Sequence, residues 1–198
     1  MRVAVLILAA ATSLAGRVGS ARADVWPASP HGQVDARVVA AGRAATLADV
    51  GSQAMTALDG ELGPRDRALA ELALGLAWYR QGRYRPAAER LLKAEAGPLA
   101  IRDYALFLAA EATFHAGEYA AARKLLERLL KAHPRSDWRH RARFRLADCE
   151  RGLGRLTPAR KGWERWMEMY PEYPAGVAVR VALAEVDRDL GRLEAAAG

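Results

Sequence analysis

The residue types that could carry out catalysis or bind a metal are few in this sequence and lie far apart. The four histidines are His31, His115, His133 and His140, and no His-Glu-x-x-His or Cys-x-x-Cys pattern is present. Those spacings are the ones that bring metal ligands together at one site. Five serines occur, none of them within a Gly-x-Ser-x-Gly turn, the setting of a hydrolase nucleophile. We therefore predict no catalytic residue, no metal site and no cofactor.

The remaining reactive side chains have structural explanations. Cys149 is the single cysteine, so no internal disulfide can form. It falls at an inward position of an expected helix, where a thiol acts as a small apolar side chain. Acidic residues such as Glu111 and Asp148 stand near arginines at helical spacing, which favours surface ion pairs over an acid and base pair. "RGLGRL" contains a Gly-x-Gly, but at an expected helix end with no strand before it, so it is not a phosphate-binding loop.

The first 23 residues, "MRVAVLILAAATSLAGRVGSARA", have the layout of a signal peptide. A basic residue, Arg2, is followed by an apolar run and by the small-x-small pattern Ala21-Arg22-Ala23. The apolar run is shorter than the roughly 20 residues that span a bilayer. A buried first helix is the alternative interpretation. No cysteine follows the run, which argues against a lipid anchor. We expect a periplasmic or secreted chain from Asp24 onward, which does not span the membrane after signal removal.

Positive charge is concentrated in one stretch of the chain. The formal net charge is +7 at pH 7, and Lys131 to Arg165 alone contains eleven Lys or Arg against four Asp or Glu. This polarisation concerns partners and not the fold. "WRHRARFRLADCERGLGR" could suit nucleic acid, because arginines neutralise phosphates and aromatic rings stack on bases. Its arginines, however, point around more than one helix face, and the signal peptide favours a partner outside the cytoplasm. We predict no nucleic-acid partner.

Four glycines mark a repeat. They are spaced by 35, 37 and 37 residues: Gly82, Gly117, Gly154 and Gly191. Seven positions before each stands a small residue: Gly75, Ala110, Ala147 and Ala184. Two positions after each stands a large one: Tyr84, Tyr119, Leu156 and Leu193. Five positions after each stands an alanine: Ala87, Ala122, Ala159 and Ala196. The first three units are closed by prolines: Pro98, Pro134 and Pro171.

These columns fit pairs of antiparallel helices. Glycine can take the left-handed conformation that ends a helix, and small residues let two helices approach closely. Proline ends the second helix because it lacks an amide hydrogen and disfavours helical geometry in the residue before it. Ala, Leu, Arg and Glu, which favour helices, dominate the chain, and alternating strand patterns are absent. The fold class is therefore all-α, built from helical hairpins.

A hairpin of this kind cannot bury its own apolar faces. Its second helices carry stripes of large apolar side chains at helical spacing: Leu125, Leu126, Leu129 and Leu130, then Trp163, Trp166 and Met167. Neighbouring hairpins must cover these stripes, which predicts an α-solenoid. The repeats are expected over 65–198, as units of about 66–100, 101–137, 138–174 and an incomplete 175–198. An irregular segment and capping helices are expected over 24–64. Because the chain stops where a second helix should begin, we expect a fragment or a truncated gene product.

The spacing and the small–large–small pattern resemble the tetratricopeptide repeat. Gly82, Tyr84 and Ala87, with the later proline, match the family well, as do the corresponding residues of the second unit. The early tryptophan of the family is missing at the corresponding positions, which are Glu71, Leu106, Arg143 and Arg180. The resemblance implies a right-handed superhelix of hairpins. "DYALFLAAEA", "AGEYAAA" and the signal peptide are also similar to the superhelical domain of bacterial soluble lytic transglycosylases, whose catalytic Glu-Ser dipeptide this chain lacks.

In tetratricopeptide arrays the first helix of each hairpin lines a concave groove. Carried over by register, the resemblance implies Leu72, Leu76 and Tyr79 in the first unit. In the second and third units it implies Tyr104, Phe107, Glu111, Phe114, His115, Arg141, Phe144, Asp148 and Arg151, to which we add Arg145. Arginine beside aromatic rings would suit a carboxylate-bearing peptide or a sugar. The alternative is that the phenylalanines are inter-repeat core and the arginines a solvated face.

Two hypotheses about function follow. In the first, the chain is an exported, non-catalytic scaffold that binds a protein or peptide in its groove. In the second, it is the superhelical arm of a peptidoglycan-cleaving transglycosylase without its catalytic domain, and its ligand is peptidoglycan.

Overall fold

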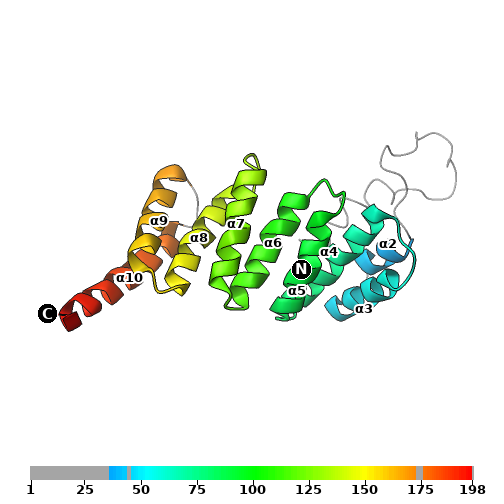
Figure 1. The fold of residues 1–198 in the computed structure, drawn as a ribbon, viewed down its shortest axis with the longest axis horizontal. Coiled ribbons are helices and arrows are strands. Elements are labelled where there is room, and N and C mark those ends of the chain that lie inside the picture. The colour runs from blue at the N-terminus through cyan, green and yellow to red at the C-terminus, as the bar shows by residue number, and fades with distance from the viewer. Residues whose placement is uncertain (1–35, 44–45, 173–175, 198) are drawn as a thin grey trace. The chain divides into compact units, whose positions relative to one another are not determined.

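The computed structural model describes residues 36–43, 46–172 and 176–197. Within these residues all regular secondary structure is helical, as predicted. Four described helices come first: α2 (Ala36–Arg43), α3 (Leu47–Leu58), α4 (Pro64–Arg80) and α5 (Tyr84–Ala96). Five follow, as Figure 1 shows: α6 (Arg102–His115), α7 (Tyr119–Ala132), α8 (Arg139–Gly152), α9 (Leu156–Met169) and α10 (Gly176–Ala197). The expected signal peptide, residues 1–23, lies outside the described residues.

The chain is divided into two compact units. The first spans residues 1–105 and the second spans residues 106–198. The boundary falls inside α6, so the first unit contains α2 to α5 and the second contains α7 to α10. The all-α, helical-repeat fold class predicted from the sequence is confirmed.

The glycine turns have the predicted left-handed geometry at three of the four positions. The φ angles of Gly82, Gly117 and Gly154 are 77°, 79° and 73°. At the first turn, the amide of Arg83 donates to the carbonyl of Trp78 at 2.9 Å, and the amide of Gly82 donates to the carbonyl of Tyr79 at 3.1 Å. The same two bonds recur at the other two turns. This is the Schellman motif, which satisfies the last carbonyls of the first helix and turns the chain into the second.

The second helices end where the prolines predict. α5 ends at Ala96, α7 at Ala132 and α9 at Met169, each two residues before its proline. The large residue after each turn is the first residue of the second helix, at Tyr84, Tyr119 and Leu156. Each of the three hairpins, α4–α5, α6–α7 and α8–α9, is therefore followed by a proline.

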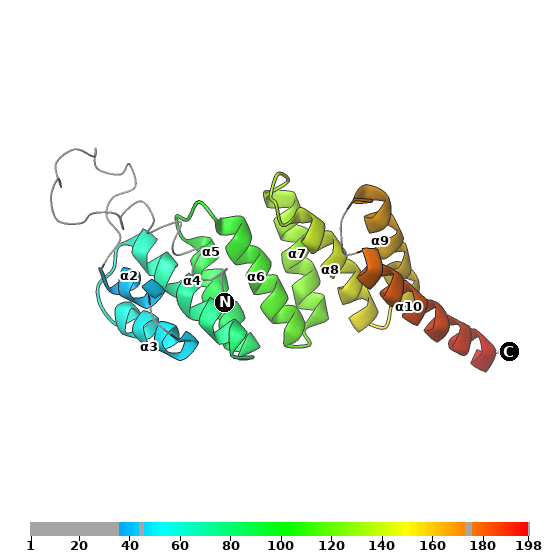
Figure 2. The same cartoon turned by 180° about the vertical axis from the view of Figure 1, so that it is seen from behind.

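In the first unit, α4 is the central helix. It packs against α2, α3 and α5, and α4 and α5 lie antiparallel side by side in Figure 1 and Figure 2. Every residue of α4 from Ala68 to Trp78 is buried, because neighbours cover it on several sides. The helices are close where Gly75 faces Leu91: a Cβ atom at Gly75 would lie 2.7 Å from Cγ of Leu91. α2 and α3 pack on each other and on α4.

In the second unit, successive helices cover one another's apolar faces. α7 packs on α8, α8 on α9, and α9 on α10. Trp163 and Trp166 of α9 are 0% and 2% exposed, and they share a core with Ala147 of α8 and with Val179 and Val186 of α10. The tryptophan stripe is thus buried by its neighbours, as predicted. Cys149 is buried nearby, and burial raises the pKa of its thiol to about 12, so it stays protonated at neutral pH.

The turn predicted at Gly191 does not form, and this prediction was wrong. α10 runs from Gly176 to Ala197 and passes through Gly191, whose φ is not in the left-handed region. The other three turns are each followed by a helix of 13 or 14 residues. Packing of that helix against the first stabilises the turn. After Gly191 come Arg, Leu, Glu and Ala, all strong helix formers, so helix propagation is favoured there.

Among the described residues, no helix has both the length and the apolar character needed to cross a bilayer.

Two buried helical glycines offer a test of the close approach in the first unit. In Gly75→Ala the new methyl group must displace Leu91, and such overpacking costs about 1–3 kcal/mol, more than the roughly 1 kcal/mol that alanine gains in helix propensity. In Gly51→Ala the nearest side-chain atom would lie 3.8 Å from the new methyl carbon, which is an ordinary contact. Only the gain in helix propensity then remains. We expect urea denaturation to show Gly75→Ala less stable, and Gly51→Ala more stable, than the parent chain. Equal effects would contradict the close packing of α4 on α5.

Candidate functional site

A pocket in the second unit lies between α6, α8 and α9. Its volume is about 310 Å³, near the lower end of the roughly 300–1,000 Å³ typical of ligand pockets. We call it the aromatic pocket, and its lining residues are Phe107, Glu111, His140, Arg141, Phe144, Arg145 and Trp166. The structure thus brings together five of the residues proposed for the groove from the sequence: Phe107, Glu111, Arg141, Phe144 and Arg145.

Three aromatic rings form the apolar wall. Phe144 of α8 meets Trp166 of α9 edge to face, with ring centroids 5.7 Å apart. Phe107 of α6 stacks on Trp138, with centroids 5.0 Å apart. The indole N–H of Trp166 donates to the carbonyl of His140 at 2.7 Å, which fixes the ring against the first turn of α8. Such paired rings have defined orientations, so the wall is pre-organised.

The polar wall is a bidentate ion pair between neighbouring hairpins. Nε and Nη2 of Arg145 donate to the two carboxylate oxygens of Glu111 at 2.6 and 2.8 Å. Nη1 of Arg145 donates to Asp148 at 2.7 Å, and the guanidinium carbon lies 4.4 Å from the ring centroid of Phe114. One arginine of α8 is therefore held by two carboxylates and one ring. This differs from both sequence interpretations, because Arg145 lines the pocket and is also a structural link to α6.

Arg141 supplies the cation that the pocket can offer to a ligand. It is exposed, and its guanidinium lies 5.3 Å from the ring centroid of Trp138. Within the described part of the chain it has no carboxylate partner. A planar guanidinium backed by an aromatic ring is well placed to bind a carboxylate with two parallel hydrogen bonds.

The pKa of Asp148, which lies directly behind the polar wall, is raised. Its side chain is 16% exposed, and burial raises its pKa to about 6. Arg145 opposes the rise, while Glu111 adds to it. The indole N–H of Trp163 also acts to lower this pKa. That buried N–H does not reach hydrogen-bond geometry with any acceptor among the described residues.

The pKa of His140 is lowered, which favours the neutral imidazole. Burial lowers its pKa, and the charges of Arg141 and Arg139 act in the same direction. Among the described residues, the ionisable side chains at the pocket and directly behind it include Glu111, Asp148, Arg141 and Arg145.

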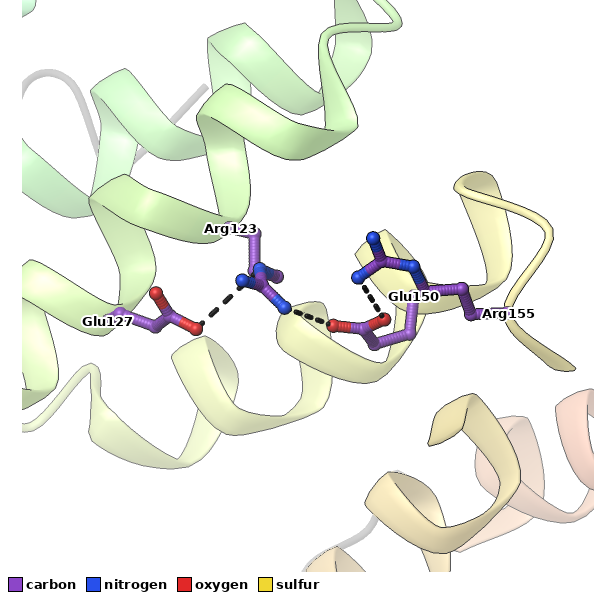
Figure 3. Close-up of polar contacts among 4 residues, drawn as sticks. All are labelled: Arg123, Glu127, Glu150 and Arg155. Atoms are coloured by element: carbon purple, nitrogen blue, oxygen red, sulfur yellow. Dashed lines mark hydrogen bonds and ion pairs between the residues drawn. The ribbon is translucent and has the colours of Figure 1, made fainter. Parts of the chain in front are cut away.

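A second cluster of ion pairs holds α8 against α7. Arg123 of α7 donates to Glu150 of α8 at 2.9 Å and pairs with Glu127 at 3.6 Å, while Arg155 reaches Glu150 at 3.4 Å. Figure 3 shows the side chains in a row: Glu127 and Arg123 from α7, Glu150 from α8, and Arg155 from the turn between α8 and α9. The hydrogen bond to Glu150 is the main cause of the raised pKa of Arg123. This cluster fixes the helix that carries four of the pocket's lining residues.

Other residues proposed for the groove do not line this pocket. Tyr79, in the first unit, meets Tyr84 edge to face, and Tyr104 is 6% exposed. Phe114 and His115 contact each other near the end of α6, and Arg151 pairs with Glu185 of α10 at 2.8 Å. Two further residues of the implied register, Leu72 and Leu76, are buried in the core of the first unit and cannot meet a ligand. The concave groove itself remains a prediction.

His140 and Trp166 were not proposed for binding from the sequence. The signal that could have found Trp166 is its place in the hairpin. In an antiparallel pair, residues at similar distances from the turn face each other. Phe144 stands ten residues before Gly154 and Trp166 twelve after it. The register along the first helices does not include this relation across the hairpin, so it does not identify Trp166 of α9 as part of the apolar wall.

Comparison with known proteins supports the fold. The tetratricopeptide repeat model matches residues 104–136, most of the second predicted unit. Among solved structures, MamA (MSR-1) is 20% identical, with a TM-score of 0.57 over 81% of this chain and 86% of that one. A putative kinesin light chain of Podosopora anserina with nearly identical TPR-like repeats is 18% identical, with a TM-score of 0.59 over 76% and 82%.

These identities show the fold alone. No curated protein matches the chain. The similarity to lytic transglycosylases is not confirmed by the matches and stays a prediction.

The pKa of Asp148 predicts a pH-dependent stability. Because the folded state holds the proton more tightly than the unfolded state, the free energy of unfolding should rise as pH falls through about 6. Asp148→Asn removes the buried charge and should stabilise the protein at pH 8 by up to about 3 kcal/mol, with little effect near pH 4. Urea denaturation at both pH values measures this. The exposed Asp59→Asn is the matched control and should change neither value. Destabilisation of Asp148→Asn at pH 8 would show that attraction to Arg145 outweighs burial.

Proposed function

We propose that this tetratricopeptide-repeat-like protein is a scaffold that binds a segment of a partner protein at the aromatic pocket. The observation that carries the proposal is the combination of a pre-organised aromatic wall with Arg141, a guanidinium that has no carboxylate partner in the described residues. Arrays of helical hairpins present such side chains on a rigid frame, which suits binding of an extended peptide.

The proposed binding surface is formed by the first helices of successive hairpins. α6 contributes Phe107 and Glu111, and α8 contributes Arg141, Phe144 and Arg145. This is the side that the tetratricopeptide resemblance assigns to the concave groove. We place the partner segment along this side, with one of its side chains in the aromatic pocket.

The scaffold is proposed to have no catalytic activity. Both carboxylate oxygens of Glu111 accept hydrogen bonds from Arg145, and its side chain is 11% exposed. Asp148 lies behind the same arginine. A general acid or base must reach the substrate atom whose proton it transfers, and these carboxyls are occupied by a structural contact instead.

We further propose that the scaffold acts outside the cytoplasm, in the periplasm or after secretion. The support is the sequence of residues 1–23, with its basic start, apolar run and small-x-small end.

A photo-crosslinker tests the binding surface. Phe144→p-benzoylphenylalanine puts a reactive ketone in the pocket, and Met55→p-benzoylphenylalanine puts one at an exposed position of α3. In cells we expect a defined protein adduct from position 144 and none from position 55. Adding Arg141→Glu should reduce the adduct at least several-fold without loss of the folded protein. Equal labelling at both positions, or no adduct at position 144, would contradict the proposal.

Export has its own test. Expression of the full chain with a C-terminal tag should yield a fractionated protein whose intact mass begins at Asp24. Changing Ala21 and Ala23 to Lys should leave the first 23 residues attached, because the processing enzyme requires small residues there. An unprocessed parent chain that stays in the cytoplasm would favour the buried first helix.

A further inference from the structure

The pocket is connected to a titrating carboxyl by a chain of charges along α8. Arg141, Arg145 and Asp148 follow an i, i+4, i+7 pattern, so they lie on one face of the helix. Arg145 lines the pocket on one side and contacts Asp148 on the other at 2.7 Å. A charge bound at Arg141 therefore acts on Asp148 through a partly buried environment, where screening is weaker than in water.

Two carboxyls share one arginine at the pocket. Glu111 and Asp148 both accept hydrogen bonds from Arg145, and Arg141 lies on the same face of α8. A ligand carboxylate at Arg141 would add negative charge near both carboxyls. Asp148 is the one whose burial favours the neutral form, so the added charge favours its protonation.

We propose that the aromatic pocket binds an acidic peptide segment that carries a large apolar side chain, and that this binding is coupled to the uptake of one proton by Asp148. The inference rests on the proposed scaffold function and adds the chemistry of its partner. The apolar side chain of the partner packs against the wall formed by Phe107, Phe144 and Trp166, and a neighbouring Asp or Glu side chain pairs with Arg141.

The charge of the surrounding chain favours an acidic segment over a single carboxylate. Lys131 to Arg165 has seven more basic than acidic residues. Several of these arginines already pair with carboxylates of the chain, but Arg141 and the exposed Arg135 and Arg165 do not within the described residues. A segment with several carboxylates gains from this field along its length, whereas the pocket volume accommodates only one large side chain.

The groups that face Asp148 come from three helices. Arg145 belongs to α8 itself, Glu111 to α6, and the indole N–H of Trp163 to α9. Its other close neighbours on α8 are Cys149, whose thiol stays protonated, and Glu150, which is held by Arg123. On α10, Glu185 pairs with Arg151 of α8. Asp148 itself has a pKa raised to about 6, so we assign the response to it. His140, at the start of the pocket, is the competing titrating group.

The sign of the effect follows from linkage. The pKa of Asp148 is about 6 without ligand, and a bound carboxylate raises it further. The affinity for the peptide is therefore lowest at a pH above the pKa that Asp148 has in the complex. It increases as the pH falls, until the pH lies below the pKa that Asp148 has in the free protein. For two charges on the order of 10 Å apart near a protein surface, we expect a three- to ten-fold tighter Kd at pH 5 than at pH 8.

The test uses defined peptides and fluorescence anisotropy on the full chain. The probe is a rhodamine-labelled, C-terminally amidated decapeptide of Ser and Glu with one central Phe. Three comparison probes are used. In the first every Glu is replaced by Gln, and in the second Phe is replaced by Ala. The third is the Gln peptide without amidation, so that it keeps a free C-terminal carboxylate. We expect the Glu–Phe probe to bind most tightly, and more tightly at pH 5. Equal binding of the Gln peptide, or a preference for the free terminal carboxylate, would overturn the acidic segment as the ligand.

Three variants assign the proton. Asp148→Asn should bind at pH 8 as tightly as the parent binds at pH 5, with no further pH dependence. His140→Gln should keep the pH dependence. Arg141→Gln should weaken binding at least ten-fold, while Arg135→Gln, which removes the same charge from an exposed position, should weaken it only slightly. pH dependence that survives in Asp148→Asn and disappears in His140→Gln would overturn the coupling to Asp148.

The two levels of proposal fail differently. If no probe binds but position 144 still crosslinks a protein in cells, the acidic ligand is wrong and the scaffold stands. If neither is observed, the scaffold function is wrong as well.

Discussion

Every part of this structure depends on one constraint: a hairpin of two helices has too little interior to bury its own apolar side chains. Trp163 and Trp166 of α9 are buried because α8 and α10 both reach them. In the first unit α4 is buried along most of its length because α2, α3 and α5 surround it. Burial of this kind is the dominant stabilising term in folding, and here it is available only between elements. The repeat is therefore a requirement of the core.

The same constraint creates the candidate site. Bringing α6 and α8 together desolvates Glu111 and Arg145, and their bidentate pairing offsets that cost. Asp148 shares the arginine with Glu111 and is less well compensated, which explains its raised pKa. The contact that positions the helices thus leaves Asp148 with a pKa of about 6. This carboxyl lies beside a pocket that has an accessible guanidinium.

The ion pairs between hairpins follow the repeat. Glu111, Asp148 and Glu185 are each 37 residues apart, and they are contacted by Arg145 or Arg151 of α8. On the second helices, Arg123 pairs with Glu150, and the equivalent Arg160 pairs with Asp187 at 2.7 Å. Periodic charge therefore accompanies periodic apolar packing in the second unit. Because Arg123–Glu150 and Arg160–Asp187 join equivalent positions of successive hairpins, these two pairs favour one register of stacking. Partly exposed ion pairs add little stability of their own.

The sequence by itself determined the helical class and the three formed turns, because these depend on local preferences: the left-handed freedom of Gly82, Gly117 and Gly154 and the prolines that end the second helices. Gly191 has the same local signal but lies inside α10, because the strong helix formers after it favour continuation of the helix. Part of the candidate site, Phe107, Glu111, Arg141 and Phe144 on α6 and α8, was proposed from the register that the tetratricopeptide resemblance implies, and Arg145 was added to it. Only the tertiary structure decided that Trp166 and His140 complete it and that Arg145 is tied to Glu111. Which side chains meet across helices depends on the rotation and separation of those helices, and these are set by the packing of whole hairpins.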